Sequence, residues 1–296
     1  MSSLGLSGNS GSSAGTSSSF SLQGTKDFLQ SNSAVAKFAF LLLVILLFVM
    51  TLRYGVALLN WIFSPSGNPH MIDGMIDARH MLVVQQDPSK DGAKPILRSN
   101  NQRDGIEFTW SVWIYIDDLD YGAGTFKHIF HKGNDDINYT QAPTGLNEPN
   151  NGPGLYITPN KNNLLVIMNT FDKIKEKIII EDVPLNKWIN VMIRVENTTV
   201  DCYINGTVTK RHELSGVPFQ NYGNVYMSMN GGFSGYTSNL WYWNYALGTS
   251  HIQSIIDQGP NMTMVGSDMN ESKPRYFSLR WFFANTGSQQ DGYGGF

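Results

Sequence analysis

The longest apolar stretch of the chain runs from Phe38 to Phe63, and its first part, Phe38 to Leu52, carries no charge. Fifteen helical residues rise about 22 Å, which is less than the ~30 Å hydrocarbon core of a bilayer. The helix must therefore extend back to Ser33, with Lys37 at one membrane face, or forward to Phe63, with Arg53 inside it. We expect a single transmembrane helix over residues 34–63, marked by Phe38, Leu41, Leu42, Ile45, Phe48, Leu52, Arg53 and Trp61.

Arg53, Ala57 and Asn60 recur at i, i+4 and i+7 on one side of this helix, where Arg53 and Asn60 form a narrow polar line. A charged side chain is costly in mid-bilayer, so Arg53 is expected at headgroup level or paired with protein. A buried helix of a soluble core and a cleaved signal peptide are the alternatives. The run is apolar on all faces, too long, and too far from Met1 to favour either.

From Ile106 the apolar period changes to two. Phe108, Trp110, Val112, Ile114 and Ile116 share one strand face, and Trp113 and Tyr115 lie on the other. Large apolar residues on both faces predict a strand that is covered on both sides, as in a two-sheet sandwich. Further strands are expected over 127–131, 154–158, 164–171, 174–181, 188–195, 198–204, 207–214, 224–229 and 238–243.

Asn205-Gly206 favours a tight hairpin turn in which both φ angles are positive. Near the end of this region, Ile252, Ile255 and Ile256 indicate one short helix, capped by Thr249 or Ser250. Many strands with one short helix predict a mainly β chain, an antiparallel two-sheet jelly-roll sandwich.

The predicted organisation has five parts. Residues 1–33 form a Ser/Gly-rich flexible tail, 34–63 the transmembrane helix, and 106–257 the jelly roll. Residues 64–105 are a linker with short strands at His80–Gln85 and Pro95–Ser99. This segment either holds the jelly roll off the membrane or packs against the jelly roll as extra strands. Residues 258–296 are an extension with one apolar strand, Arg275–Phe283.

The composition of the chain excludes some classes of partner and site. The 296-residue chain has a net charge of −3 and no basic run, which argues against nucleic acid. Its one cysteine, Cys202, excludes an intrachain disulfide and a metal site built on several cysteines.

No catalytic pattern stands out. Glu181 and Asp182 are adjacent and point to opposite sides of a strand, so they cannot act as a glycosidase pair. His128 and His131 are odd-spaced and are likewise expected on opposite faces. Two oxygen-rich loops, 117–120 and 134–136, offer Ca²⁺ ligands, but Asp and Asn also dominate ordinary turns. We expect no enzyme activity and no cofactor or metal.

Aromatic residues supply the candidate binding chemistry. Tyr and Trp stack on sugar rings and are enriched at protein interfaces. Alternation turns half of those in 241–245 into the sandwich. The candidate contacts for a protein partner or a glycan are Tyr222, Tyr242, Tyr245 and Trp281.

Five stretches between Ile106 and Ile256 stand out, namely FTWSVWIYID (108–117), HIFHKGN (128–134), GPGLYITPNKNNLLVIM (152–168), VPLNKWINVMIRVENTTVDCYINGTVTKR (183–211) and GGFSGYTSNLWYWNYALGTSHIQSII (231–256). Together they resemble the laminin-G-like, concanavalin A-like jelly-roll family. The resemblance implies a jelly roll and admits lectins, hydrolases, adhesion modules and passive structural domains. The Glu-x-Asp-x-x-Glu motif of the family's hydrolases is missing.

The order of tail, single span and jelly roll also resembles membrane-anchored virion proteins of large DNA viruses. We therefore expect a non-enzymatic minor capsid protein, single-pass in the virion membrane, that links the bilayer to other structural proteins of the shell. The alternative is a membrane-tethered, lectin-like module that binds glycans.

Overall fold

The computed structural model describes residues 33–102 and 105–265, and for residues 100–102 it describes the backbone alone. The chain divides into two compact units, Met1–Ser64 and Pro65–Phe296. The predicted strand at 275–283, the tail before residue 33 and Trp281 lie outside the described residues.

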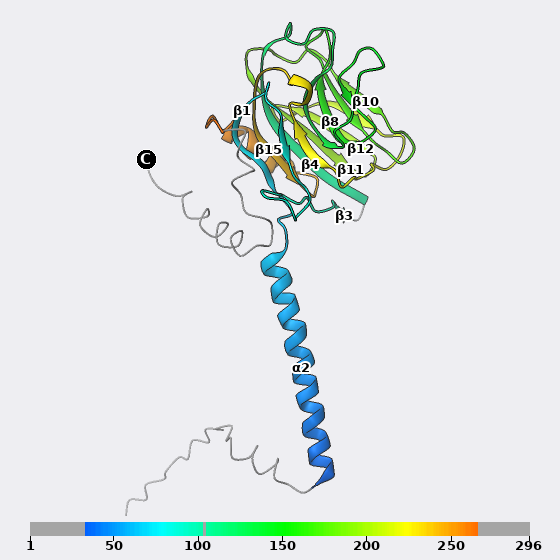
Figure 1. Ribbon diagram of the computed structural model, residues 1–296, viewed down its shortest axis with the longest axis vertical. Helices are drawn as coiled ribbons and strands as arrows, with labels where there is room; N and C mark the ends of the chain where they lie inside the picture. Colours follow the sequence, from blue (N-terminus) through cyan, green and yellow to red (C-terminus); the bar gives the residue numbers. More distant parts are fainter. Residues whose placement is uncertain (1–32, 103–104, 266–296) are drawn as a thin grey trace, which may run out of the picture. The chain divides into compact units, whose positions relative to one another are not determined.

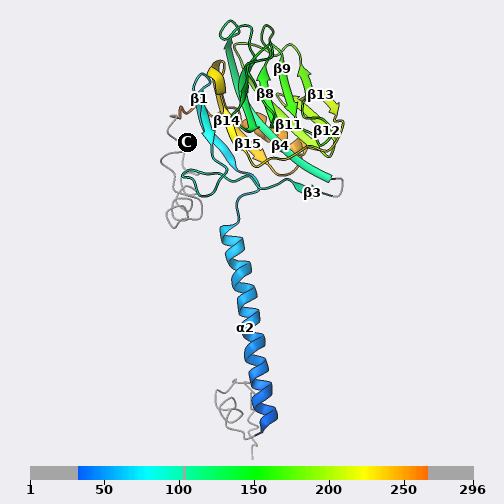
Figure 2. The same cartoon turned by 45° about the vertical axis from the view of Figure 1, so that its right-hand side comes forward.

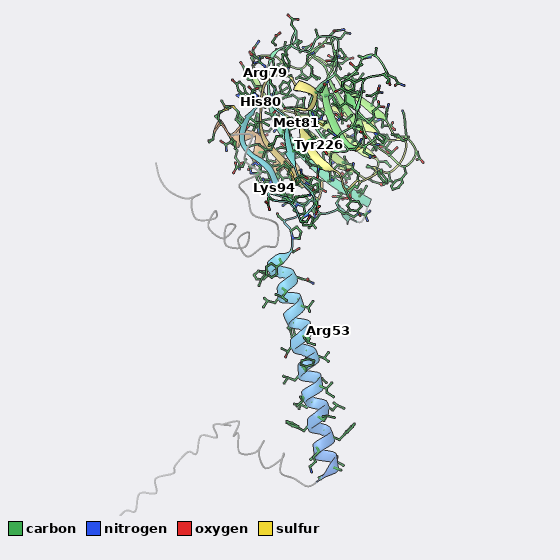
Figure 3. All side chains as sticks on the ribbon, in the orientation of Figure 1. Arg53, Arg79, His80, Met81, Lys94 and Tyr226 are labelled. Atoms are coloured by element: carbon green, nitrogen blue, oxygen red, sulfur yellow. The ribbon has the colours of Figure 1, made fainter. Side chains whose placement is uncertain are left out.

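The first unit contains the helix α2, Ala34–Phe63, which is continuous and has no buried residue. Figure 1 shows it as one uninterrupted coil, and side chains project from it on all sides, Arg53 among them (Figure 3). Thirty residues rise about 45 Å, more than a bilayer core requires. It is the one helix within the described residues that is long and apolar enough to cross a membrane.

The second unit is a sandwich of two antiparallel sheets, whose strands run side by side in both ribbon views (Figures 1 and 2). The larger sheet has the order β1-β15-β4-β11-β12-β13, with β3 paired to β4. Its strands are β1 His70–Asp77, β3 Asn100–Gln102, β4 Gly105–Asp118, β11 Trp188–Glu196, β12 Thr199–Ile204, β13 Thr207–Glu213 and β15 Ser234–Trp243.

The smaller sheet has the order β10-β9-β8-β5-β14-β2. Its strands are β2 Leu82–Val84, β5 Lys127–Gly133, β8 Asn151–Ile157, β9 Leu164–Met168, β10 Glu176–Ile180 and β14 Asn224–Met227. A separate pair, β6 Ile137–Asn138 and β7 Leu146–Asn147, a short 3-10 turn, Met229–Gly231, and the helix α3, Thr249–Gln258, complete the unit. The predicted mainly β, two-sheet antiparallel sandwich after an apolar helix is confirmed.

The core between the sheets follows the alternation of β4. Its inward face, from Phe108 to Ile116, is buried in the main core, where Trp110 packs 5.4 Å from Phe130 and 5.0 Å from Tyr242, centroid to centroid. Trp113, on the outer face, is 6% exposed. The strand is thus covered on both sides, as its sequence predicts.

The hairpin prediction is also confirmed. Asn205 and Gly206 have φ values of 48° and 79°, and they join β12 to β13. The short helix is present as α3, but its N-cap is Gly248, not Thr249 or Ser250. Ile252 of α3 is buried against Met192, Tyr203 and Trp243, so the helix covers the outer face of the larger sheet.

The segment before residue 106 adds strands to the sandwich, which is the second of the two arrangements expected for it. β1 pairs with β15 and β2 pairs with β14, so the sandwich begins at His70. The alternation of β1 is interrupted by Asp73 and Gly74, and the register shifts between Ile72 and Met75, which hides it from a periodicity reading. The strand expected over Pro95–Ser99 is absent, since those residues form no ladder.

Candidate functional site

A cavity of about 640 Å³ lies between the two sheets, and we call it the sandwich cavity. Phe108, Trp110 and Tyr242 come from the larger sheet, while β5 and β14 supply the opposite wall. Two connecting segments, residues 86–98 and 220–223, contribute most of the rest. The lining is Gln86, Asp87, Pro88, Pro95, Ile96, Leu97, Arg98, Phe108, Trp110, Lys132, Gly133, Asn134, Gly152, Gln220, Asn221, Tyr222, Gly223, Asn224, Tyr226 and Tyr242.

Hydrogen bonds attach the segment 86–98 to both sheets. The Tyr242 hydroxyl donates to the carbonyl of Leu97 (3.2 Å), and the amide of Gln86 donates to Asn224 Oδ1 (2.9 Å). Glycine allows the closest approach, because a Cβ on Gly223 would lie 2.0 Å from the carbonyl oxygen of Gly133. The cavity walls are therefore built into the fold.

Lys132 is the unusual residue of this cavity. It is 8% exposed, and its ammonium donates to the carbonyls of Asn221 (2.9 Å) and Gly223 (2.7 Å). Burial lowers the pKa of Lys132 to about 8, since no carboxylate among the described residues compensates for the lost hydration. An ammonium has three donors, so one remains beyond these two bonds among the described residues.

Charge in the lining is unbalanced. Arg98 is exposed and makes no hydrogen bond or ion pair with a described residue, and Asp87 is the one carboxylate that lines the cavity there. A hydrogen bond from Ser89 lowers the pKa of Asp87, so it is ionised at neutral pH. Two cations face one anion, which favours a ligand with negative charge.

The cavity brings together two of the four aromatic residues predicted as contacts. Tyr222 is 85% exposed at its rim, and Tyr242 is 2% exposed in its wall. Tyr242 is thus not a surface contact, because strand alternation turns it into the core. Tyr245 is half-buried against the cluster under α3.

Sequence reasoning missed Lys132, Arg98 and the segment 86–98. Lys132 is the last residue but one of β5, KHIFHKG, in which every residue is buried, and a lysine in such a strand was the available signal. The cavity itself could not be read from the sequence, because its walls come from segments more than a hundred residues apart.

His128 and His131 contact each other, which contradicts the expectation of opposite faces. A register shift between His128 and Phe130 inserts one residue into β5 and turns both rings to the same side. The Met229 amide donates to His128 Nδ1 (3.0 Å), so His128 Nε2–H donates to His131 Nδ1 (2.6 Å). His131 Nε2–H then donates to the carbonyl of Asn134 (2.7 Å).

His128 and His131 are both neutral at pH 7. Burial lowers the pKa of His131 to about 4, and burial together with His131 lowers the pKa of His128 further below its usual value. Each ring nitrogen of the two histidines makes a hydrogen bond within the protein. The pair is therefore a structural element of β5 and not a free acid or base.

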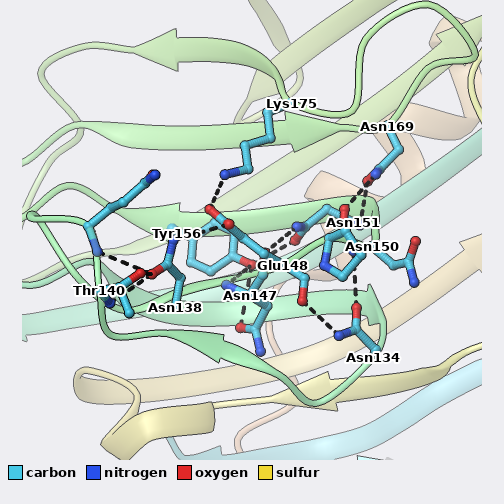
Figure 4. Close-up of polar contacts among 12 residues, drawn as sticks. Asn134, Asn138, Thr140, Asn147, Glu148, Asn150, Asn151, Tyr156, Asn169 and Lys175 are labelled. Carbon is cyan, nitrogen blue, oxygen red and sulfur yellow. Dashed lines mark hydrogen bonds and ion pairs between the residues drawn. The ribbon is translucent and has the colours of Figure 1, made fainter.

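An asparagine network covers the outer face of the smaller sheet (Figure 4). The segment 134–151 lies over the sheet, and the Tyr156 hydroxyl donates to Asn151 Oδ1 (2.6 Å). Asn169 Nδ2 donates to the carbonyl of Pro149 (2.7 Å), and Lys175 pairs with Glu148. This face is therefore closed by the chain's own residues.

The acidic loops serve as turns. Asp118 accepts a hydrogen bond from the amide of Asp120 (2.8 Å), and Asn134 Nδ2 donates to Asp136 (2.8 Å). Within the described ranges, no group of three His, Cys, Asp or Glu side chains is placed to hold a metal ion.

The fold and cavity define a two-sheet β-sandwich of the binding-module type. Residues 91–253 match the profile of the Concanavalin A-like lectin/glucanases superfamily, in its laminin G form, and the chain belongs to this family. None of the curated proteins compared with it matches.

Solved structures with a similar fold include the botulinum neurotoxin serotype D binding domain, at 15% identity and a TM-score of 0.42, which covers 55% of this chain and 39% of that one. The serotype G binding domain matches at 12% identity and a TM-score of 0.39, over 52% and 36%. The chain spans less than half the length of these domains. This likeness implies no ligand.

Proposed function

We propose that this protein is a membrane-tethered, lectin-like module that binds a glycan in the sandwich cavity. One observation carries the proposal: a cavity of about 640 Å³ combines indole and phenol walls with two cationic side chains. Pockets of this size are the default binding sites of a fold. Membership of the concanavalin A-like lectin family supports the same ligand class.

The chemistry of the lining favours an acidic glycan. Aromatic rings pack against the C–H face of a sugar, and Tyr222 stands exposed at the rim for this contact. Arg98 and Lys132 provide donors for a carboxylate or sulfate group, and charge-assisted hydrogen bonds of this type are the strong ones.

We propose that the module binds the glycan without catalysing a reaction on it. Glycoside hydrolysis uses a pair of carboxyl groups on either side of the scissile bond. Among the described residues, Asp87 is the one carboxyl group that lines the sandwich cavity, which supports binding over hydrolysis.

A glycan array probed with the full chain tests this proposal. The wild type and Tyr139→Ala, a control with an exposed tyrosine away from the cavity, are expected to retain acidic glycans. Tyr222→Ala and Arg98→Ala are expected to weaken retention about tenfold each, without a change in thermal stability, since both residues are exposed. Absence of binding to every glycan, or equal binding by all four proteins, would contradict the proposal.

The tether is α2, proposed as a single-pass anchor, because no residue of the helix is buried. A minor capsid protein that links a virion membrane to its shell stays a prediction from the sequence organisation. It requires protein contacts in place of a glycan. Release of the chain from all capsid partners by detergent would exclude that prediction.

A further inference from the structure

The wall of the sandwich cavity holds a buried amine whose hydrogen bonds leave one position open. Lys132 belongs to β5, one residue before the strand ends, and is 8% exposed. Its Nζ donates to the carbonyl oxygens of Asn221 (2.9 Å) and Gly223 (2.7 Å). Lys132 and both of these partners line the cavity, so the nitrogen lies in its wall.

Two carbonyl partners are enough for an uncharged amine. A neutral amino group has two N–H donors and one lone pair, whereas an ammonium has three donors. Both hydrogen bonds of Lys132 can therefore persist after it loses a proton. No carboxylate among the described residues pairs with Nζ, so the loss of the proton breaks no ion pair there. The fourth tetrahedral position then carries the lone pair, which is the nucleophilic part of an amine.

Burial also favours the uncharged form of this side chain. It lowers the pKa of Lys132 to about 8, so about a quarter of the side chains are free amine at pH 7.5, against about 0.1% for an ordinary lysine. Lysines that are desolvated in this way form Schiff bases with carbonyl compounds. Burial lowers the pKa of Lys127 too, but Asp118 and Asp120 act in the opposite direction, and Lys127 does not line the cavity.

The rest of the lining favours an anionic ligand with a flat ring. Arg98 is exposed and has no hydrogen bond or ion pair with a described residue, so it is available to a phosphate or carboxylate group. Phe108, Trp110 and Tyr242 supply aromatic walls that a ring can stack on. A volume of about 640 Å³ is within the range of small-ligand sites.

We infer that Lys132 forms a reversible imine with an anionic aromatic aldehyde that enters the sandwich cavity. The Nζ lone pair attacks the aldehyde carbon and forms a C–N bond, while the carbonyl π pair moves to oxygen. One amine proton moves to this oxygen in the carbinolamine, and the second leaves with the hydroxyl group as water, which completes the C=N bond. Uptake of a proton from solvent by the imine keeps one N–H for a neighbouring carbonyl.

This reaction consumes no oxidant or reductant, and hydrolysis returns the amine and the aldehyde. The inference goes beyond the proposed function, because it concerns a covalent bond at Lys132 and does not rest on the binding of a glycan.

Pyridoxal 5′-phosphate, an aromatic aldehyde with a phosphate group, is the probe. It is mixed in equimolar amount with the full chain in detergent at pH 7.5, and borohydride then reduces the imine to a stable amine. Peptide mapping by mass spectrometry is expected to find at least about ten times more label on Lys132 than on exposed Lys187 or buried Lys127. Absence of label from Lys132, or equal labelling of the three lysines, would overturn the inference.

Two lysine variants separate the imine from the positive charge. Lys132→Arg keeps a cation and donors for the two carbonyls but forms no imine, so it is expected to lose the absorption band of the Schiff base. Lys187→Arg, the matched control, is expected to keep this band. A band of equal strength in both variants would contradict the assignment. The peptide map of the wild type locates the site by itself, so the result does not depend on whether Lys132→Arg folds.

Pyridoxal, which lacks the phosphate group, tests the charge of the ligand. It is expected to label Lys132 about fivefold less than the phosphate ester does, and Arg98→Ala is expected to remove this difference. Equal labelling of the wild type by both aldehydes would contradict the anionic class. Failure of every glycan on the array would leave the imine result intact, whereas failure of the imine would leave glycan binding by Lys132→Arg intact.

Discussion

Cys202 lies in β12 with its side chain buried between the sheets, and burial raises the pKa of its thiol to about 12. The thiolate is the reactive form of cysteine, so a thiol with this pKa is almost entirely unreactive at neutral pH. Burial also lowers the pKa of Lys132, because it disfavours the charged form of any side chain. Tyr242 is buried too, and its side chain forms part of the cavity wall.

We expect Cys202 to react with Ellman's reagent at pH 8 only after unfolding. The chain has one cysteine, so the signal reports this site alone. The measurement compares the rate in buffer with the rate in denaturant. Rapid reaction of the folded protein would contradict the burial of β12.

Gly206→Ala is expected to lower the free energy of unfolding by about 1 kcal/mol or more. Gly206 has a φ of 79°, a region unfavourable for residues with a Cβ, and its Cβ would lie 3.2 Å from Ile256 Cγ1 of α3. Urea unfolding measures the change. An unchanged midpoint and slope would show that the turn tolerates a side chain.

At the scale of elements, strand alternation and turn residues carry most of the fold. β4 and β11 could be predicted from period-two patterns, and the β12–β13 turn from Asn205-Gly206. Register shifts between paired strands could not be predicted from these patterns. One extra residue in β5 turns His128 toward His131, because a shift by one position exchanges the two faces of a strand.

This pair makes stability depend on pH. The unfolded histidines titrate near 6.5, whereas burial lowers the folded pKa of His131 to about 4, and burial together with His131 also lowers the pKa of His128 well below 6.5. The unfolded state therefore binds more protons between pH 6.5 and 4, and stability present above 6.5 is lost as the pH falls. For His131 alone the loss is about 3 kcal/mol.

Urea unfolding of the full chain in detergent, at pH 7, 6, 5 and 4.5, measures this loss. His80→Gln, which changes an exposed histidine, is expected to keep the slope, and a His128→Gln/His131→Gln double variant is expected to flatten it. Identical slopes in the wild type and a folded double variant would contradict the assignment.

For α2, the expected outcome is that the chain stays in the membrane pellet after alkaline carbonate extraction, at full-length mass. Ile45→Arg/Phe48→Arg is expected to release most of it, since each arginine at mid-helix costs about 3 kcal/mol of insertion. Phe63→Arg, at the helix end, is the control and is expected to stay bound. Equal release of all three, or loss of the segment by cleavage, would contradict the anchor.

At the scale of the whole molecule, the fold class and family could be predicted, while the sandwich cavity could not. The cavity joins residues from distant segments, such as Arg98 with Tyr222. Its shape depends on how loops close over the sheets, which local patterns do not encode. The sequence did identify Tyr222 and Tyr242, two of the aromatic residues that line the cavity.

Photocrosslinking tests the central claim most directly. The best-bound acidic glycan from the array, carrying a diazirine, is irradiated with the full chain, and the labelled peptides are identified by mass spectrometry. Labelling is expected within residues 86–98 and 220–226, which line the sandwich cavity, with loss of the signal in Arg98→Ala. Labelling elsewhere on the sandwich, or labelling unaffected by Arg98→Ala, would contradict glycan binding in this cavity.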